Sequence, residues 1–336
     1  MMKYIFKSNF LTSMKLIQFC VFGVLIASAT FISSCDKVKN PYLPQYVDID
    51  TTLLPAGTTL QDYKNNSWSD WSENTNSVVN VLIEDFTGHK CVNCPLAAID
   101  ARAIESAHEG RVFVASIHAA PDGGTGFQNT SGSLFSHDFT NPNGLAISTE
   151  ITDGGFVGNP SGTVNRKLFG GQIFQGNTSW SGYTTTILTD NNFVINLQAQ
   201  TNYFTETRGL FLHTEIDIKQ PTLVDTNQIY QVVYLIEDSL IAPQITPSSW
   251  GNPNDIDQAY VHRDIMRGCI DNQPMGRQIT SAFKVDKNGN ILTGNKYYIN
   301  YSYKLPDQYN PENMHLLIYV YNNTTKEILQ VIKKDF

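Results

Sequence analysis

The chain has 336 residues, 41% of them hydrophobic and 16% charged, with a formal net charge of −8. This length is sufficient for two domains of ordinary size. The acidic balance comes without a Lys/Arg cluster, which argues against a nucleic-acid partner. We attribute the charge to solubility in an extracytoplasmic setting.

The N-terminus has the pattern of a secretory signal. Three lysines precede an apolar stretch, residues 16–32, and no acidic residue occurs before Asp36. Such a segment is removed from the mature protein and does not belong to its fold. The sequence therefore predicts a signal peptide over residues 1–34.

The end of this segment predicts a lipid anchor. Residues 32–35, Ile-Ser-Ser-Cys, resemble a lipobox, so Cys35 is expected to become the lipidated, palmitate-bearing first residue of the mature chain. An ordinary signal peptide or a membrane anchor is the alternative. No later segment is apolar for long enough to span a bilayer. We expect the protein to be tethered to a membrane through Cys35.

Residues 35–76 are predicted to link the lipid to the first domain. They are rich in Asn, Ser, Thr and Pro, but they include Trp68 and Trp71. Two tryptophans suggest that part of this linker packs on the globular body, and full disorder is the alternative.

A Cys-x-x-Cys pair carries the main chemical signal. Cys91 and Cys94 follow an apolar strand-like run, residues 78–86, and precede a helical pattern, residues 96–109. Two thiols at this spacing can close a disulfide, and the free N–H groups of a helix start favour the thiolate of Cys91. The helix has four apolar residues on one face at helical spacing: Leu96, Ile99, Ala103 and Ala107.

The surrounding pattern predicts a βαβ unit. The strand at 78–86, the helix and a second apolar strand at 111–118 require a parallel pair with a right-handed crossover. A weak helical stretch follows near residues 145–151, and residues 180–190 are expected to form a closing helix. This first domain is predicted to run from 77 to 190.

The stretch NVLIEDFTGHKCVNCP, residues 80–95, resembles the signature of Bacteroidetes lipoproteins related to the 28-kDa outer membrane protein. The likeness extends to GNPSGTVNR at 158–166 and, more loosely, to AYVHRDIMR at 259–267. That family pairs a thioredoxin-like domain with a β-rich C-terminal region. The resemblance implies a thioredoxin-like fold for residues 77–190 and a place at the cell outer membrane, either periplasmic or surface-exposed.

The same resemblance implies further site residues. In thioredoxin-like proteins a cis-proline opens the next strand beside the cysteines, and Pro160 occupies that place, with Asn159 offering its backbone to a bound chain. A trans proline in an Asn-Pro turn is the alternative. Asp85 stands where such proteins have a buried acid that relays a proton to the second cysteine. Alternatively, Asp85 or Glu84 points to solvent.

Three basic residues lie near the pair. His89 and Lys90 place potential positive charge beside Cys91, or they are solvated loop side chains. His118 ends its strand at the sheet edge that faces the helix start and is a candidate for contact with the substrate. One cysteine pair supplies two of the four ligands that zinc prefers, no second pair or HxxxH completes the set, and His89 and His118 could in principle contribute. We expect neither a metal nor a cofactor.

Compartment and cysteine count predict the state of the thiols. An oxidising environment makes a Cys91–Cys94 disulfide the expected resting state. Cys269 is then unpaired. A buried, inert thiol is the favoured interpretation, and a partner thiol is the alternative.

Residues 191–336 are predicted to form an all-β domain. Seven strand patterns separated by polar turns suggest an immunoglobulin-like sandwich: 191–201, 208–218, 228–238, 281–285, 296–305, 314–321 and 327–334. An excursion at 242–276 contains AYVHRDIMRGC, which fits a helix or an irregular strand. Its His262, Arg263 and Arg267 are expected in interdomain or structural salt bridges rather than in a site.

Two functions follow from these patterns. In the first, Cys91 exchanges disulfides with protein thiols or disulfides, Cys94 resolves the mixed disulfide and Pro160 presents the partner backbone. In the second, the chain is a surface binding or adhesion lipoprotein and the Cys91–Cys94 bridge is structural. Exchange requires that the thiol of Cys91 be reachable.

Overall fold

The computed structural model describes residues 49–120, 126–151 and 158–336. The predicted signal peptide and Cys35 lie outside these residues. Within the described ranges, every helix is too short or too polar to cross a membrane.

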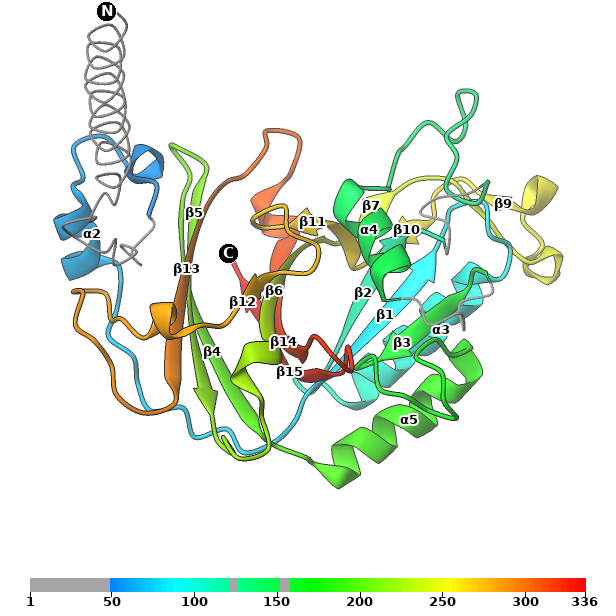
Figure 1. The fold of residues 1–336 in the computed structure, drawn as a ribbon. Helices are drawn as coiled ribbons and strands as arrows, with labels where there is room; N and C mark the ends of the chain where they lie inside the picture. Colours follow the sequence, from blue (N-terminus) through cyan, green and yellow to red (C-terminus); the bar gives the residue numbers. More distant parts are fainter. Residues whose placement is uncertain (1–48, 121–125, 152–157) are drawn as a thin grey trace, which may run out of the picture. The chain divides into compact units, whose positions relative to one another are not determined.

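The predicted βαβ unit is present (Figure 1). Strand β1 (Val81–Thr87) pairs in parallel with β2 (Val112–His118), and helix α3 (Cys94–Ala107) connects them. Helix α4 (Pro142–Glu150) follows, and then β3 (Ser161–Val164) pairs antiparallel with β1. Helix α5 (Asn177–Asp190) ends this part of the chain, as the sequence predicted.

Later strands extend the same sheet. Its order is β15-β14-β6-β11-β2-β1-β3, built with β6 (Ile229–Glu237), β11 (Ile265–Cys269), β14 (Met314–Asn322) and β15 (Ile328–Asp335). The junction is a parallel pairing of Ile265 in β11 with Ser116 in β2. Strands from both sides of the predicted boundary at residue 190 therefore share one sheet.

Three remaining long strands form a second sheet, ordered β13-β5-β4. They are β4 (Ile195–Phe204), β5 (Gly209–Ile218) and β13 (Lys296–Lys304). An apolar cluster packs this sheet against β6 and β14. The immunoglobulin-like sandwich is not confirmed, because the strands of residues 191–336 divide between this sheet and the one shared with residues 77–190. The described fold is mixed α/β.

The excursion predicted at 242–276 is built of short strands rather than a helix. AYVHRDIMRGC forms β10 and then β11. The predicted strand at 281–285 is wrong, since its first residues form a 3-10 turn. The short elements are η1 (Thr51–Leu53), α2 (Leu60–Asn66), η2 (Thr226–Gln228), β7 (Leu240–Ile241), β8 (Gln244–Ile245), η3 (Ser248–Trp250), η4 (Pro253–Asp255), β9 (Ile256–Asp257), β10 (Val261–His262), β12 (Arg277–Gln278), η5 (Ser281–Phe283) and η6 (Pro311–Asn313).

The two faces of the long sheet have different covers. Val81 and Ile83 of β1 pack with α3 and α5, whereas Leu82 and Phe86 pack in the cluster that contains α4. Successive strand residues point to opposite faces. Asp85 therefore points toward α3, and Glu84 points toward the opposite face.

Helix α3 does not bury the apolar face that predicted it. Its buried residues are Cys94, Pro95, Ala97, Ala101 and Ile104. Leu96 and Ile99 are 42% and 44% exposed. Small alanines on the buried side let the helix approach β1 and β2 closely, and the larger apolar side chains remain outside.

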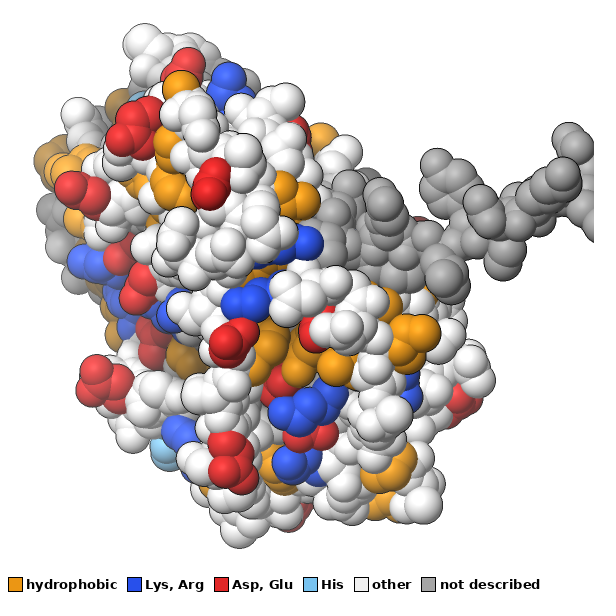
Figure 2. Space-filling view, turned by 90° about the vertical axis from the view of Figure 1, so that its left-hand side faces the viewer, with side chains coloured by type: hydrophobic (Ala, Val, Ile, Leu, Met, Phe, Trp, Pro, Cys, Tyr) orange, Lys and Arg blue, Asp and Glu red, His pale blue; other side chains and the backbone are white. Residues whose placement is uncertain are grey.

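Part of the predicted linker packs on the second sheet. Trp68 is 3% exposed, and its ring stacks on His213 of β5 with the ring centroids 3.7 Å apart. Trp71 stacks on Tyr298 of β13 at 5.6 Å. On the face shown in Figure 2, Lys and Arg side chains lie among Asp and Glu side chains rather than in one basic patch.

Candidate functional site

Cys91 and Cys94 form a disulfide at the start of α3, with their Cα atoms 5.4 Å apart. The N–H of Cys94 donates to the carbonyl of Cys91 at 3.3 Å. Asn93, the N-cap residue, makes no side-chain hydrogen bond to the helix start. The amino end of α3 is therefore directed toward the disulfide without a side-chain cap.

Both cysteines are buried, with exposed fractions of 2% for Cys91 and 1% for Cys94. Residues 240–262, here called the insert, contribute to this cover; they leave and return through the paired strands β7 and β10. The Gln244 side chain donates to the carbonyls of Cys91 at 3.1 Å and Ile245 at 2.9 Å. The expectation of a reachable Cys91 thiol is wrong for this conformation.

The backbone of the insert also pairs with the cysteine loop. The N–H of Ile245 donates to the carbonyl of His89 at 2.8 Å. On another side, the N–H of Lys90 donates to the carbonyl of Phe127 at 3.0 Å. A Cβ at Gly88 would lie 2.6 Å from that carbonyl oxygen, so only glycine permits this approach. The loop before Cys91 is therefore hydrogen-bonded to two segments, the insert and the segment that contains Phe127.

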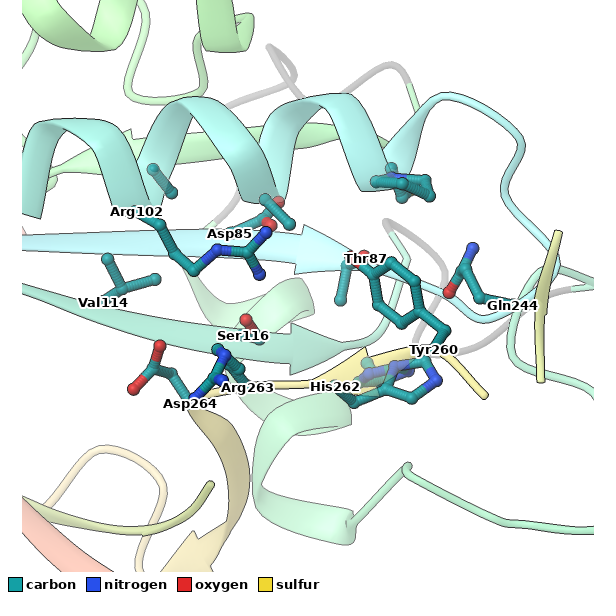
Figure 3. A pocket seen from close by; sticks show the side chains of 15 residues that line it. Asp85, Thr87, Arg102, Val114, Ser116, Gln244, Tyr260, His262, Arg263 and Asp264 are labelled. Carbon is teal, nitrogen blue, oxygen red and sulfur yellow. The ribbon is translucent and has the colours of Figure 1, made fainter. Parts of the chain in front are cut away.

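Asp85 lies in the cavity next to the disulfide. It is 1% exposed, and neither carboxylate oxygen has a hydrogen-bond partner. The cavity, of about 30 Å³, is lined by Asp85 and Cys94 together with residues of β2 and the insert (Figure 3). Burial raises the pKa of Asp85 to about 7, although the positive charge of Arg102 opposes this. The solvent-facing alternative for Asp85 is excluded.

Its neighbour Glu84 is also buried but fully paired. Arg166 donates to both carboxylate oxygens, at 2.8 and 2.6 Å, and Tyr234 donates at 2.7 Å. Burial opposes ionisation of Glu84, but Arg166 outweighs it and the pKa of Glu84 lies below its usual value. The ion pair joins β1 to the second residue after β3, and the Tyr234 hydrogen bond joins β1 to β6. The surroundings of Glu84 thus favour its charged form, whereas those of Asp85 favour its neutral form.

Histidines gather beside the cavity. His118 and His262 line it, and both rings pack on Phe139, with centroid distances of 4.8 and 4.6 Å. His89 is 2% exposed, and its ring contacts the carbonyl of Asn129 at 3.0 Å. Burial lowers the pKa of His89, so its ring supplies no positive charge to Cys91 at neutral pH. His118 lies by the pair, as strand topology predicted.

The other residues that the sequence singled out lie as follows. The Asn159–Pro160 peptide bond is cis, and the Asn159 side chain donates to the carbonyl of Ala119 at 2.8 Å. Lys90 donates to Ser131 at 2.8 Å. Cys269 is free and buried, and burial raises its pKa far above the usual range.

The two arginines of the excursion form ion pairs. Arg263 contacts Asp238 at 3.1 Å, and Arg267 contacts Glu237 at 3.4 Å. The structural salt-bridge interpretation is therefore confirmed for these two residues. It is wrong for His262, which instead lines the cavity beside Cys94.

Sequence reasoning missed Gln244, Arg166 and Tyr260, the last of which also lines the cavity (Figure 3). Gln244 lies in the two-residue strand β8, directly after Pro243 and without a periodic pattern, and more than a hundred residues separate it from Cys91. A charged residue two positions after a strand, as Arg166 is, gives no indication that it will be completely buried. The GNPSGTVNR resemblance did include Arg166, but it assigned no role to it.

Fold and site together define a mixed α/β protein with a covered disulfide at a helix start. A family model described as "Outer membrane protein Omp28" matches residues 150–336, more than half of the chain. The chain therefore belongs to the Omp28 family. The insert lies inside the matched region, and the cysteine pair lies before it. A search of curated proteins found no match.

Several solved structures resemble this one. HBP35 of Porphyromonas gingivalis has a TM-score of 0.56 at 15% identity, covering 78% of this chain and 77% of that chain. A domain of the outer membrane lipoprotein Omp28 from Porphyromonas gingivalis has a TM-score of 0.25 at 16% identity, covering 43% of this chain and 89% of that chain. At these identities, the HBP35 likeness supports the fold and no activity.

Proposed function

We propose that this chain is a lipoprotein anchored to the outer membrane through Cys35, with a thioredoxin-like part, residues 77–190, that performs thiol–disulfide exchange. Three observations support the thioredoxin-like assignment: the βαβ unit with β3 antiparallel to β1, the disulfide at the start of α3, and the cis bond at Asn159–Pro160. The family's description as outer membrane proteins supports the location.

The observation that carries the exchange proposal is the unpartnered carboxyl of Asp85. A buried polar group without a hydrogen bond lowers stability, and a purely structural disulfide does not need one beside it. A carboxyl whose burial raises its pKa to about 7 is matched to proton transfer near neutral pH. Both Asp85 and Cys94 line the same cavity, which supports Cys94 as the group that exchanges a proton with Asp85.

The step begins from the disulfide that the structure contains. A substrate thiolate attacks the sulfur of Cys91, the S–S bond breaks, and the sulfur of Cys94 leaves with the electron pair and takes the proton of Asp85. A second substrate thiolate then displaces Cys91, so the substrate becomes a disulfide and both cysteines are reduced. Asn159 offers its backbone to the substrate chain during this step.

Burial of the disulfide imposes a condition on this reaction. Gln244 and the backbone of Ile245 hold the insert against the cysteine loop. A substrate reaches Cys91 only when the insert withdraws. We therefore propose exchange that depends on opening of residues 240–262.

The same burial favours a second function. If the insert never withdraws, the Cys91–Cys94 bridge is structural and the chain is a non-catalytic binding or adhesion lipoprotein of the outer membrane. In that case Asp85 makes no contribution that a neutral side chain would not make.

Trapping of the mixed disulfide tests the two functions. In the reverse direction of this step, the Cys91 thiol attacks a substrate disulfide and the Cys94 thiol resolves the mixed disulfide. A Cys94→Ser variant keeps the Cys91 thiol and lacks the resolving one, so it is expected to accumulate a covalent adduct with a peptide disulfide. A Cys91→Ser variant is the matched control and should accumulate none. Mass spectrometry of the folded proteins measures the adduct. An adduct-free Cys94→Ser protein would favour the structural bridge.

A further inference from the structure

Residues 49–76, which the sequence assigned to the linker, pack on the second sheet, and we call them the docked segment. The first residues of this segment are buried together with its middle. Ile49, Leu53 and Tyr63 have exposed fractions of 9%, 9% and 0%. They share an apolar cluster with Phe211 of β5. The chain therefore joins the folded body at residue 49, well before the first strand.

Hydrogen bonds fix the start of the docked segment. The N–H of Asp50 donates to the hydroxyl of Ser302 at 2.9 Å. The hydroxyl of Thr207 donates to the carbonyl of Leu53 at 2.6 Å. A Cβ at Gly209 would overlap the same carbonyl oxygen, so this close approach of the two backbones requires glycine. Residues of β13 and of the turn between β4 and β5 thus hold the segment at its first turn.

The rest of the docked segment is bound to the same sheet. The hydroxyl of Tyr63 lies 2.6 Å from Nε2 of His213, and both residues are completely buried. Near the end of the segment, the side chain of Asn74 donates to the carbonyl of Leu197 in β4 at 2.7 Å. These contacts run from residue 50 to residue 74, so the segment is held along its whole length.

Docking shortens the tether between the proposed lipid and the folded body. Only 13 residues, 36–48, separate Cys35 from the docked segment, whereas a free linker would have 41 residues, 36–76. A flexible chain of 13 residues has a root-mean-square length of roughly 20 Å and reaches at most about 45 Å. A folded unit of this size is roughly 50 Å across. The tether is therefore too short to let the body turn freely above a membrane.

The disulfide lies on the other side of this folded unit. The docked segment packs on one face of the second sheet, and the opposite face packs on β6 and β14. In the long sheet, β11 and β2 come between β6 and β1, and the disulfide follows β1. Figure 1 shows the same order, with α2 beside the second sheet and β9 of the insert beyond β1. Ile49 and the disulfide are thus at opposite ends of this order.

We propose that the docked segment turns the near end of the second sheet toward the membrane and keeps the disulfide and the insert on the side that faces away. This inference rests on the lipid anchor at Cys35 proposed above. The membrane-facing surface surrounds Asp50 and includes Glu206, Thr207, Ser302 and Lys304. It carries charges of both signs, so the short tether sets the orientation rather than attraction to anionic lipids. The partner of the disulfide is then a polypeptide of the aqueous compartment.

Energy transfer to labelled vesicles tests this orientation. The lipidated full chain is reconstituted in phosphatidylcholine vesicles that contain a rhodamine lipid, and a donor dye is attached to Glu206→Cys or to Ser249→Cys. Both positions are exposed; the first lies beside the docked segment and the second lies in the insert. The native pair is a disulfide and Cys269 is buried, so they do not take the dye. We expect transfer from position 206 to exceed that from position 249 about twofold or more.

A longer tether is the matched control. A Gly/Ser spacer of about 30 residues, inserted between residues 48 and 49, leaves the docked segment in place and gives a tether about as long as the free linker. The two labelled positions should then show equal transfer. Equal transfer in the chain without the spacer, or stronger transfer from position 249, would overturn the proposal.

Vesicle flotation separates this inference from the anchor on which it rests. The lipidated chain should float with the vesicles, and Cys35→Ala should not. A chain that stays in solution would contradict the anchor and the orientation together. A chain that floats but shows equal transfer from the two positions would contradict the orientation alone. Neither measurement involves the exchange reaction, so the trapping experiment remains an independent test of that function.

Discussion

The adjacent carboxylates of β1 predict opposite effects of two minimal substitutions. Asp85 is buried without a hydrogen-bond partner, and Glu84 is buried against Arg166. Asp85→Asn and Glu84→Gln each replace a carboxylate by a neutral amide of nearly the same shape. We expect Asp85→Asn to stabilise the protein and Glu84→Gln to destabilise it.

The magnitude for Asp85 follows from its pKa. The folded value is about 7 against a usual 3.8, a difference of about three units, each worth about 1.4 kcal/mol. Because the folded pKa is raised, the stability contributed by Asp85 is fully present below the unfolded pKa and is lost as pH rises through the folded pKa. Asp85→Asn should therefore raise the free energy of unfolding by about 2 kcal/mol at pH 5 and by about 4 kcal/mol at pH 8.5.

Glu84→Gln has the opposite sign because it leaves the Arg166 charge buried without its counter-ion. Breaking a buried pair in this way costs about 3–5 kcal/mol. The pKa of Glu84 is depressed, so its contribution is present above the unfolded pKa and is lost as pH falls through the folded value. The stability gained by Asp85→Asn should thus increase as the pH rises. Glu84→Gln should lower stability throughout the neutral range.

Urea unfolding of the protein at pH 5 and pH 8.5 measures both effects as differences in the free energy of unfolding. The reasoning fails if Asp85→Asn lowers stability at pH 8.5, or if its effect is the same at the two pH values. Either outcome would mean that Asp85 has a partner in solution, and the argument for proton transfer to Cys94 would lose its basis.

Three further substitutions test the cover of the site, the linker and the helix face. Gln244→Ala removes the hydrogen bonds that hold the insert, worth about 1–2 kcal/mol, and should speed phosphine reduction of the disulfide roughly 5- to 30-fold; an unchanged rate of thiol release would argue against opening through residues 240–262. Trp68→Ala removes a buried ring that stacks on His213 and should lower the free energy of unfolding by about 3 kcal/mol in urea, whereas a loss below about 1 kcal/mol would mean that the linker is detached in solution. Leu96→Lys on the exposed face of α3 should change the free energy of unfolding by less than about 0.5 kcal/mol, while Ala97→Lys on the buried face should prevent folding. Equal effects of the two substitutions would contradict this assignment of the buried face.

Local periodicity predicted the elements that it controls. The strands and helix of the βαβ unit, the closing helix and the strands at 314–321 and 327–334 each depend on a pattern within one element. The prediction of which face of α3 is buried was wrong for a related reason. Leu96 and Ile99 carry the stronger helical pattern, but the sheet beneath accepts only the alanine side.

Contacts between segments far apart in the chain could not be predicted from local sequence patterns. The edge of β2 pairs with Ile265, a neighbour that no local pattern specifies, and this pairing joins the two predicted domains in one sheet. The cover of the disulfide has the same origin. Gln244 contacts the carbonyl of Cys91 and His262 lines the cavity that Cys94 also lines, and both residues belong to the insert that β7 and β10 hold.

The equilibrium reduction potential of the Cys91–Cys94 pair tests the central claim of exchange most directly. It is measured on the folded mature chain in dithiol buffers, with the insert intact and with Gln244→Ala as a comparison. Exchange predicts a potential above roughly −300 mV, in the range of redox-active pairs. A potential well below that value in both proteins would identify a structural bridge and contradict the proposed function.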